Sequence, residues 1–345
     1  MSFFGNKPKK MFRKRRNDME LKLTNIKKSF EDKEILHGIS FSVESGKALG
    51  LLGRNGAGKT TTIRIIMDVF RANEGEITLD GEKFVPKSNQ IGYLPEERGL
   101  YPKKTVTEQM VYLACLRGKN KKDALESTKR WLKRLEVDEY ATRKLDTLSK
   151  GNQQKVQLAA TLVGDPEIVI LDEPFSGLDP VNSQILKDVI KELISEGRIV
   201  IFSSHQMSYV EEFCEDIVII DHGDVVLSGN LDDIKTEYGK GRRIVSANNL
   251  SMEELKELCD SKLSDKVSVH DMNKHYVILN VKDGVSQWQI LDALKENNVD
   301  VKTFGAYEPS LNDIFVARVG EEEENEVKSE HEEEQPKKKG LFGRR

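Results

Sequence analysis

The sequence predicts an α/β protein in which a mostly parallel sheet with crossover helices precedes a small α+β domain. From Glu20 to Leu231, short β-branched runs that end in loops rich in Gly, Ser or Asp alternate with amphipathic stretches. Within this part, from about 103 to 147, the strands stop and apolar residues recur with helical spacing. From 243 to 318 the order of patterns becomes βαββαβ, which is typical of a ferredoxin-like domain.

Composition and length narrow the class of protein. The 345 residues suffice for about two domains. With 37% hydrophobic and 32% charged residues and a net charge of -4, we expect a globular protein with no nucleic-acid partner. No apolar stretch approaches the ~20 residues that a membrane-spanning helix needs, so any membrane work requires another chain to cross the bilayer. The widely spaced cysteines are expected to be reduced, structural thiols of a cytoplasmic protein: Cys115, Cys214 and Cys259.

The two ends of the chain differ from the rest in charge. Residues 1–18 interleave basic and aromatic side chains, which predicts either an arm that lies on anionic lipid or a solvated extension. Residues 320–345 hold an acidic run closed by basic residues, and this composition predicts disorder. These ends leave 19–240 for the larger domain and 243–318 for the α+β domain.

A glycine-rich segment from Gly53 to Thr60 fits the pattern of a phosphate-binding loop. The apolar strand Ala48 to Leu52 precedes it, and helical spacing follows from Thr60 to Phe70. Glycines let consecutive backbone N–H groups turn inward, which makes an anion site at the positive end of a helix. A tight strand-to-helix turn with a solvated Lys59 is the simpler alternative.

This loop predicts a site for nucleotide phosphates and Mg²⁺. We expect Lys59 to reach the β- and γ-phosphates and the Thr60 hydroxyl to bind the metal. The remaining nucleotide contacts are assigned to Gly53, Asn55, Gly56, Gly58 and Thr61.

Two acids end a second apolar strand. The run from Ile168 to Leu171 has the form of a strand buried on both faces, and Asp172 and Glu173 follow it directly. Since open α/β sheets bind ligands at this edge, we expect Asp172 to hold Mg²⁺ through water and Glu173 to polarise the attacking water as general base. An ordinary solvated strand end is the alternative. His205 follows a further apolar strand; alone it would be structural, but at this edge it is a candidate contact to the γ-phosphate.

The segment Leu148 to Gln154, with sequence LSKGNQQ, identifies the class of nucleotide enzyme. Ser149 is placed to cap a helix from Gln153 to Val163, and the Gly151 amide can face an anion there. Alone this would be a loop that begins a helix. Together with the phosphate loop (Walker A) and the strand with its acids (Walker B), it resembles the ATP-binding subunits of ABC transporters over about residues 20–235. It departs from the common signature at Lys150 and Asn152, where Gly and Gln are usual.

The resemblance implies a P-loop NTPase core of the ABC type with an inserted helical subdomain, and it assigns further roles. Ser149 and Gly151 would face the Walker A site of a second copy, so that two ATP molecules lie between two subunits. Phe30 takes the place of the aromatic residue that stacks on adenine, and Asp179 lies in the loop that reaches across the dimer. His205 matches the switch histidine. Glu96 replaces the usual glutamine that senses Mg²⁺ and water; its carboxylate can bind metal or accept from water but cannot donate as an amide does.

Within the family, the segment around Glu96, the α+β domain and Ser310 to Phe315 most resemble two-component bacterial exporters of the sodium-extruding and antibiotic-resistance kind. This implies an ATPase dimer, of identical chains or close paralogues, that powers integral-membrane permease subunits from the cytoplasmic face of the membrane. A soluble ABC ATPase acting on ribosomes or DNA is one alternative, although its usual paired cores or long coiled coils are not visible here. A non-catalytic regulatory subunit is another, against which the intact site residues argue.

Overall fold

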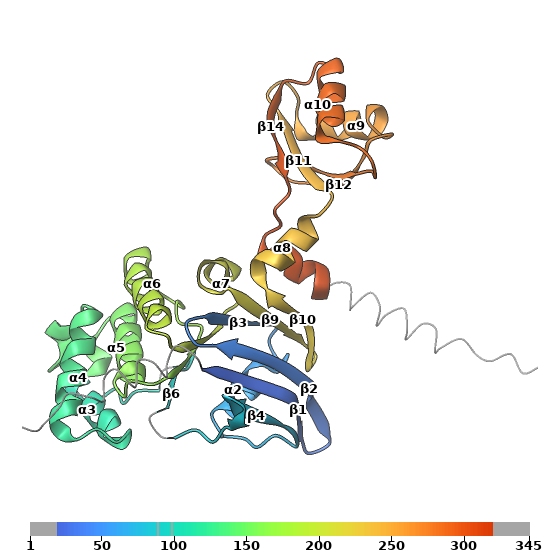
Figure 1. Ribbon diagram of the computed structural model, residues 1–345. Helices are drawn as coiled ribbons and strands as arrows, with labels where there is room; N and C mark the ends of the chain where they lie inside the picture. Colours follow the sequence, from blue (N-terminus) through green and yellow to red (C-terminus); the bar gives the residue numbers. More distant parts are fainter. Residues whose placement is uncertain (1–18, 88–89, 98, 320–345) are drawn as a thin grey trace, which may run out of the picture. The chain divides into compact units, whose positions relative to one another are not determined.

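The computed structural model describes residues 19–87, 90–97 and 99–319, and these divide into two compact units between Leu231 and Asp232 (Figure 1). The sequence placed the end of the larger domain at 240. Most of helix α8 (Leu231–Gly239) instead falls in the second unit. The expectations for the basic arm at 1–18 and the charged tail at 320–345 lie outside the described residues.

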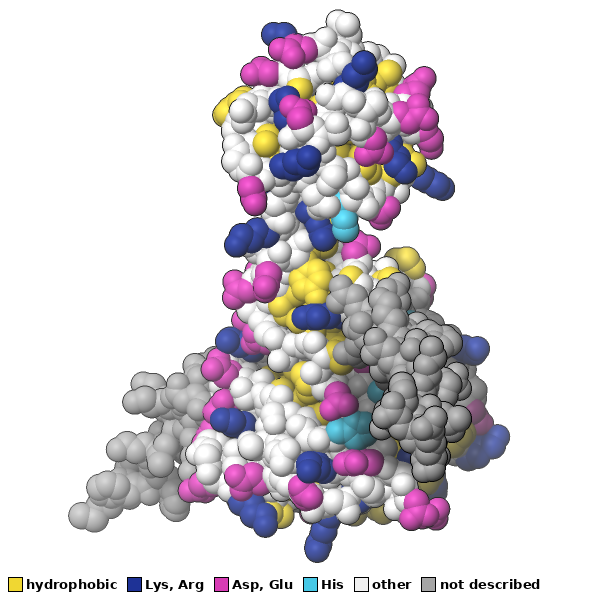
Figure 2. Space-filling view, turned by 90° about the vertical axis from the view of Figure 1, so that its right-hand side faces the viewer, with side chains coloured by type: hydrophobic (Ala, Val, Ile, Leu, Met, Phe, Trp, Pro, Cys, Tyr) yellow, Lys and Arg dark blue, Asp and Glu magenta, His cyan; other side chains and the backbone are white. Residues whose placement is uncertain are grey.

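The surface of the molecule carries charges of both signs. In the view of Figure 2, Lys and Arg side chains are interspersed with Asp and Glu. A few large apolar side chains are also exposed, among them Tyr101, Tyr112 and Leu116. Across the described ranges, no helix combines the length and the apolar character that crossing a membrane demands.

The first unit is built on a six-stranded sheet with the order β10-β9-β3-β8-β7-β6. Neighbouring strands run parallel except β9 and β10, as expected for strands joined by crossover helices. β3 and β8 are buried along their whole length, which explains their unbroken apolar sequences. The strands are β3 (Ala48–Leu52), β6 (Ile91–Leu94), β7 (Ile168–Asp172), β8 (Ile199–Ser203), β9 (Asp216–Asp221) and β10 (Asp224–Asn230).

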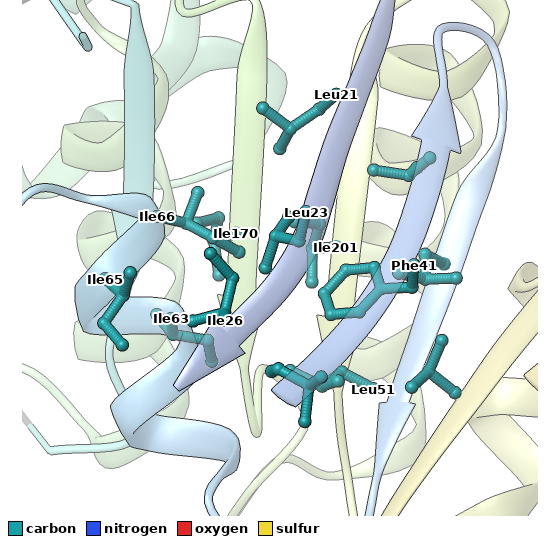
Figure 3. Packing of buried hydrophobic residues seen from close by; sticks show 14 of the residues in the cluster. Leu21, Leu23, Ile26, Phe41, Leu51, Ile63, Ile65, Ile66, Ile170 and Ile201 are labelled. Carbon is teal, nitrogen blue, oxygen red and sulfur yellow. The ribbon is translucent and has the colours of Figure 1, made fainter. Parts of the chain in front are cut away.

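A second, antiparallel sheet with the order β2-β1-β4-β5 completes the core together with helix α2 (Lys59–Ile66). Leu23 of β1, Ile66 of α2 and Ile170 of β7 belong to one buried cluster (Figure 3). This cluster fixes α2, and therefore the phosphate loop before it, against both sheets. α2 ends at Ile66 and not at Phe70, because Asp68 adopts a left-handed backbone with φ 57°. The strands of this sheet are β1 (Glu20–Phe30), β2 (Lys33–Glu44), β4 (Glu74–Leu79) and β5 (Glu82–Lys83).

Between β6 and β7 the chain is helical, as the spacing predicted. α3 lies within the stretch that was predicted to be helical, and a capping box of Thr105 and Glu108 fixes its start. The helical stretch continues beyond the expected limit of 147 through α5, and Figure 1 shows α3, α4 and α5 grouped together. The helices and 3₁₀ turns of the first unit after α2 are α3 (Val106–Leu116), α4 (Lys121–Arg134), η1 (Asp138–Tyr140), η2 (Leu145–Thr147), α5 (Lys150–Leu162), α6 (Pro180–Ser195) and α7 (Met207–Phe213).

The second unit has the predicted ferredoxin-like fold. Its sheet has the order β12-β13-β11-β14 with all neighbours antiparallel, and α9 and α10 are the two crossover helices. Both helices begin with a capping box, at Ser251 and Ser286. A helical segment at 311–319 follows the sheet. The elements are β11 (Arg242–Ala247), α9 (Met252–Lys262), β12 (Val267–Met272), β13 (Val277–Val281), α10 (Gln287–Glu296) and β14 (Val301–Ala306).

Candidate functional site

The phosphate loop joins β3 to α2, and its backbone conformation requires glycine. Gly53, Gly56 and Gly58 have φ of 149°, 86° and 116°, values that L-residues rarely adopt. A Cβ on Gly53 would lie 2.2 Å from the carbonyl oxygen of Ile220, and one on Gly58 would lie 2.6 Å from Leu36 Cδ2. At 53 a backbone carbonyl therefore excludes any side chain, whereas at 58 the Leu36 side chain would have to move and the positive φ adds strain.

Lys59 lies across this loop. Its Nζ donates to the carbonyl oxygens of Gly53 at 2.6 Å and Arg54 at 3.0 Å. Burial lowers the pKa of Lys59, and the charges of three nearby acids, Asp172, Glu173 and Glu96, oppose this shift. The ammonium is thus within electrostatic range of every acid expected at the site.

The polar residues beside Lys59 are accessible. Thr60 and Asn55 are exposed, and Thr61 is half-buried in the first turn of α2. The N–H groups of this turn have no intrahelical partners, so they can face an anion. The arrangement suits phosphate binding at the start of the helix.

Glu173 is fixed at the end of β7 in an unusual conformation. Its φ is 48°, a left-handed backbone that is costly for a residue with a side chain and often marks functional sites. The carboxylate is buried and accepts hydrogen bonds from the His205 backbone N–H at 2.6 Å and from Ser204 Oγ at 3.0 Å. His205 Nδ1 also lies 2.8 Å from Glu173 Oε1, while the imidazole is 72% exposed. The structure therefore brings the expected base and the switch histidine into direct contact.

Asp172, next to this base, lies in a partly buried polar environment. Tyr93 OH donates to Asp172 Oδ2 at 3.3 Å. Burial raises the pKa of Asp172, and burial together with the Asp172 charge raises the pKa of Tyr93 to about 12. The sequence pattern did not single out Tyr93 or Ser204. The available signal was their position at the ends of β6 and β8, the strands on either side of β7.

The acids and hydroxyls near the phosphate loop suit Mg²⁺ that arrives with a nucleotide. Within the described residues, no group of three or more His, Cys, Asp or Glu residues could hold a metal ion. Mg²⁺ is commonly held by one or two protein oxygens together with phosphate oxygens and water, so a complete protein cage is not required. Asp172 and Thr60 supply oxygen donors of the right kind.

Glu96 and Phe30 lie at the borders of this site. Glu96 is exposed in the segment after β6. Phe30, 39% exposed, ends β1; its ring meets Phe70 edge-on at 5.1 Å between centroids, and Lys28 Nζ lies 4.9 Å from the ring centroid. β2, which pairs with β1 in this hairpin, contacts Gly58 of the phosphate loop through Ile35 and Leu36.

The signature residues form a second group at the starts of α5 and α6. Ser149 caps α5, as expected, and its Oγ accepts from the Asn152 N–H at 3.3 Å. The helix begins at Lys150, three residues before the expected Gln153, so Gly151 lies in its first turn, where N–H groups still have no intrahelical partner.

Asp179 belongs to the same group. It caps α6 by accepting from the Asn182 N–H at 2.9 Å. A Cβ on Gly151 would lie 3.1 Å from Asn182 Nδ2, so the two helix starts are adjacent. Ser149, Gly151 and Asp179 therefore share one surface of the first unit.

Comparison with known proteins agrees with this geometry. Residues 36–176 match the ABC transporter family, and residues 229–319 match the C-terminal domain of DrrA1-3-like ATP-binding proteins. The chain is 43% identical over 271 residues to an ABC transporter ATP-binding protein of Alkalihalophilus pseudofirmus, with 78% of this chain and 98% of the relative aligned. It is 31% identical over 309 residues to the linearmycin resistance ATP-binding protein LnrL of Bacillus subtilis, with 87% and 98% aligned.

A solved structure shares the fold as well. An ATP-binding subunit of an ABC transporter superposes with a TM-score of 0.59 at 29% sequence identity, over 64% of this chain and 93% of that chain. The predicted resemblance is therefore confirmed, including its antibiotic-resistance branch. The chain belongs to the ATP-binding proteins of ABC transporters.

Proposed function

We propose that this chain hydrolyses ATP and thereby powers export through a separate membrane permease. The observation that carries the hydrolytic part is the placement of Glu173. Its buried carboxylate lies beside Asp172, in contact with His205, and within electrostatic range of Lys59. A fixed carboxylate next to a phosphate-binding loop is what general-base activation of water requires.

The proposed chemistry divides the work among these residues. The loop N–H groups and Lys59 hold the β- and γ-phosphates, while Thr60 and Asp172 hold Mg²⁺, which supplies neutralising charge to the phosphates. Glu173 takes a proton from the water that attacks the γ-phosphorus, and ADP leaves. His205, with its exposed ring, contacts the γ-phosphate, and Glu96 approaches the metal or the water.

The active unit that we propose is a dimer of this chain with a second copy or a close paralogue. Ser149 and Asp179 are exposed, and the N–H groups of Lys150 and Gly151, in the first turn of α5, have no intrahelical partner. A helix N-terminus of this kind suits the phosphates of an ATP that is bound by the other subunit.

The permease is proposed to dock on the helical part of the first unit. Tyr101, Tyr112 and Leu116 are 59%, 54% and 58% exposed there, and apolar side chains in such positions suit a protein partner. The Tyr101 N–H donates to Gln109 Oε1 at 3.1 Å, which ties the segment after Glu96 to α3. The similarity to a linearmycin resistance protein supports the direction of transport as export, with this chain at the cytoplasmic face of the membrane.

The replacement Glu173→Gln tests the hydrolytic assignment. We expect ATP binding to be retained and turnover to fall by about 100-fold or more. Glu167→Gln, at the opposite end of the β7 strand, is the matched control and should keep normal turnover. Normal ATPase activity in Glu173→Gln would remove the base assignment. The permease is tested by purification from membranes in mild detergent, where recovery without any membrane protein would contradict the exporter proposal.

A further inference from the structure

Helix α5 contacts both loops that carry the candidate acids of the ATP site. Ser149 caps its N-terminus. Gln154 and Gln157, about one and two turns further along the helix, are buried and donate hydrogen bonds to other segments of the same chain. Gln154 and Gln157 are only 6% and 4% exposed. A buried primary amide is costly unless its N–H groups are bonded, so the partners of these two side chains are under strong constraint.

Gln157 holds the segment that carries Glu96. Its Nε2 donates to the carbonyl oxygen of Pro95 at 3.3 Å and to that of Glu97 at 3.1 Å. These two carbonyls belong to the residues before and after Glu96. The side-chain amide of Gln157 therefore holds the backbone on both sides of Glu96, and we call this pair of hydrogen bonds the clamp. One turn later, Thr161 Oγ1 lies 3.2 Å from the Tyr93 carbonyl oxygen, which adds a second attachment of the same segment to α5.

Gln154 makes the corresponding contact on the other loop. Its Nε2 donates to the Pro174 carbonyl oxygen at 3.0 Å, directly after Glu173. A single helix therefore bears on the backbone next to both Glu96 and Glu173. An α-helix rises about 1.5 Å per residue and bends little, so displacement at the Ser149 end is transmitted to Gln154, roughly 7.5 Å away, and to Gln157, roughly 12 Å away.

We propose that Gln157 is a positioning residue that sets the place of Glu96 in the ATP site. The proposal rests on the proposed function, since it takes Glu96 as the group that approaches the metal or the water. Loss of the clamp leaves Glu96 on a looser segment, and the site then needs more Mg²⁺ to become active. Affinity for the nucleotide itself, which the phosphate loop determines, stays the same.

The test compares the full chain with Gln157→Leu, which keeps the volume but has no donors, and with Gln157→Glu, which keeps the length but has no N–H at neutral pH. Gln184→Leu is the matched control, because Gln184 is an exposed helical glutamine that donates to Asp188 Oδ1 at 2.9 Å. In ATPase assays titrated with Mg²⁺, we expect both Gln157 variants to need about fivefold more Mg²⁺ for half-maximal activity. ATP binding measured in EDTA should stay within about twofold of the wild type.

Amide hydrogen exchange provides a readout that does not depend on activity. Both Gln157 variants should exchange faster in the peptide that covers residues 93–97, while the Gln184 variant does not. Unchanged Mg²⁺ dependence with unchanged exchange at 93–97 would overturn the proposal. Faster exchange spread evenly over the first unit would also overturn it, since that result shows only a general loss of stability. If the wild type has no ATPase activity, the proposed function fails, and the exchange experiment still decides whether Gln157 holds this segment.

Discussion

Gly53 has a backbone conformation and a neighbour that together exclude any side chain. Its φ is 149°, and an added Cβ would lie 2.2 Å from a backbone carbonyl oxygen, which has little freedom to move. Gly56, in the same loop, also has a positive φ, but an added Cβ there would meet nothing within 4 Å. At Gly53 both the backbone conformation and the lack of space therefore require glycine, whereas at Gly56 only the backbone conformation does.

We expect Gly53→Ala to lower the free energy of unfolding by about 3 kcal/mol or more and to abolish ATP binding. Gly56→Ala should cost only about 1 kcal/mol, since the backbone strain is then the main penalty. Urea denaturation of the two variants measures the difference. Equal losses would show that the crowding at Gly53 is relieved by movement of the loop.

Asp172 is expected to reduce stability at neutral pH. Its pKa is raised by burial. At pH values between the pKa of the unfolded chain and the raised pKa of the folded chain, the folded chain therefore binds more protons than the unfolded chain. The contribution of this carboxyl to stability therefore falls as the pH rises through that window. Asp172→Asn should raise the melting temperature at pH 7, lose the gain at about pH 3, and abolish Mg²⁺-dependent hydrolysis.

Asp146 is the control, because its pKa is shifted in the opposite direction to that of Asp172. Lys103 lowers the pKa of this exposed carboxyl, so its contribution to stability is present above the unfolded pKa and is lost as the pH falls. Asp146→Asn should leave the melting temperature at pH 7 unchanged or slightly lower. A gain in both variants would indicate a general effect of removing negative charge and would contradict the assignment to burial.

At the scale of elements, the start of α5 depends on a single cap. Ser149 Oγ accepts from the Asn152 N–H, and loss of such a cap costs about 1 kcal/mol. Ser149→Ala should destabilise the first unit by this amount in urea denaturation, while Ser149→Thr keeps most of it. An unchanged midpoint in Ser149→Ala would mean that water replaces the cap at no cost.

The predictable parts of the fold are those whose signals are local. The strand, glycine loop and helix around Gly53, the cap at Ser149 and the capping box at Ser251 all depend on residues within a few positions of each other. The contacts of Tyr93 with Asp172 and of Ser204 with Glu173 could not be predicted in this way. They span 79 and 31 residues and depend on β7 lying between β6 and β8. Hydrophobic periodicity indicates strands but not their order in a sheet.

At the scale of the whole molecule, each unit has its own apolar core, and the cysteines can report on them separately. Cys214 lies in the first unit and Cys259 in the second, and both are buried, whereas Cys115 is exposed. Burial raises the pKa of the Cys214 thiol and raises that of Cys259 to about 12. Thiolate is the reactive form. Both buried thiols are therefore protected from alkylation twice, because reagent cannot reach them and because little thiolate is present.

We expect iodoacetamide at about pH 8 to modify Cys115 first and the buried thiols only when their own unit unfolds. Mass spectrometry of samples labelled at increasing urea concentrations follows each site. Simultaneous labelling of Cys214 and Cys259 at every concentration would show that the two units unfold as one. Early labelling of either site in the absence of urea would contradict its burial.

Leu23, Ile66 and Ile170 belong to one buried cluster, although they come from the antiparallel sheet, the helix after the phosphate loop and the strand before the acids. Elements that share a core unfold together. A ligand that binds only the folded chain adds RT ln(1 + [L]/Kd) to stability, roughly 2.7 kcal/mol at a hundred times Kd. ATP therefore protects both sheets and not only the loop that it touches. Proteolysis of the first unit is therefore expected to slow throughout, and not only at the loop, as the nucleotide concentration rises.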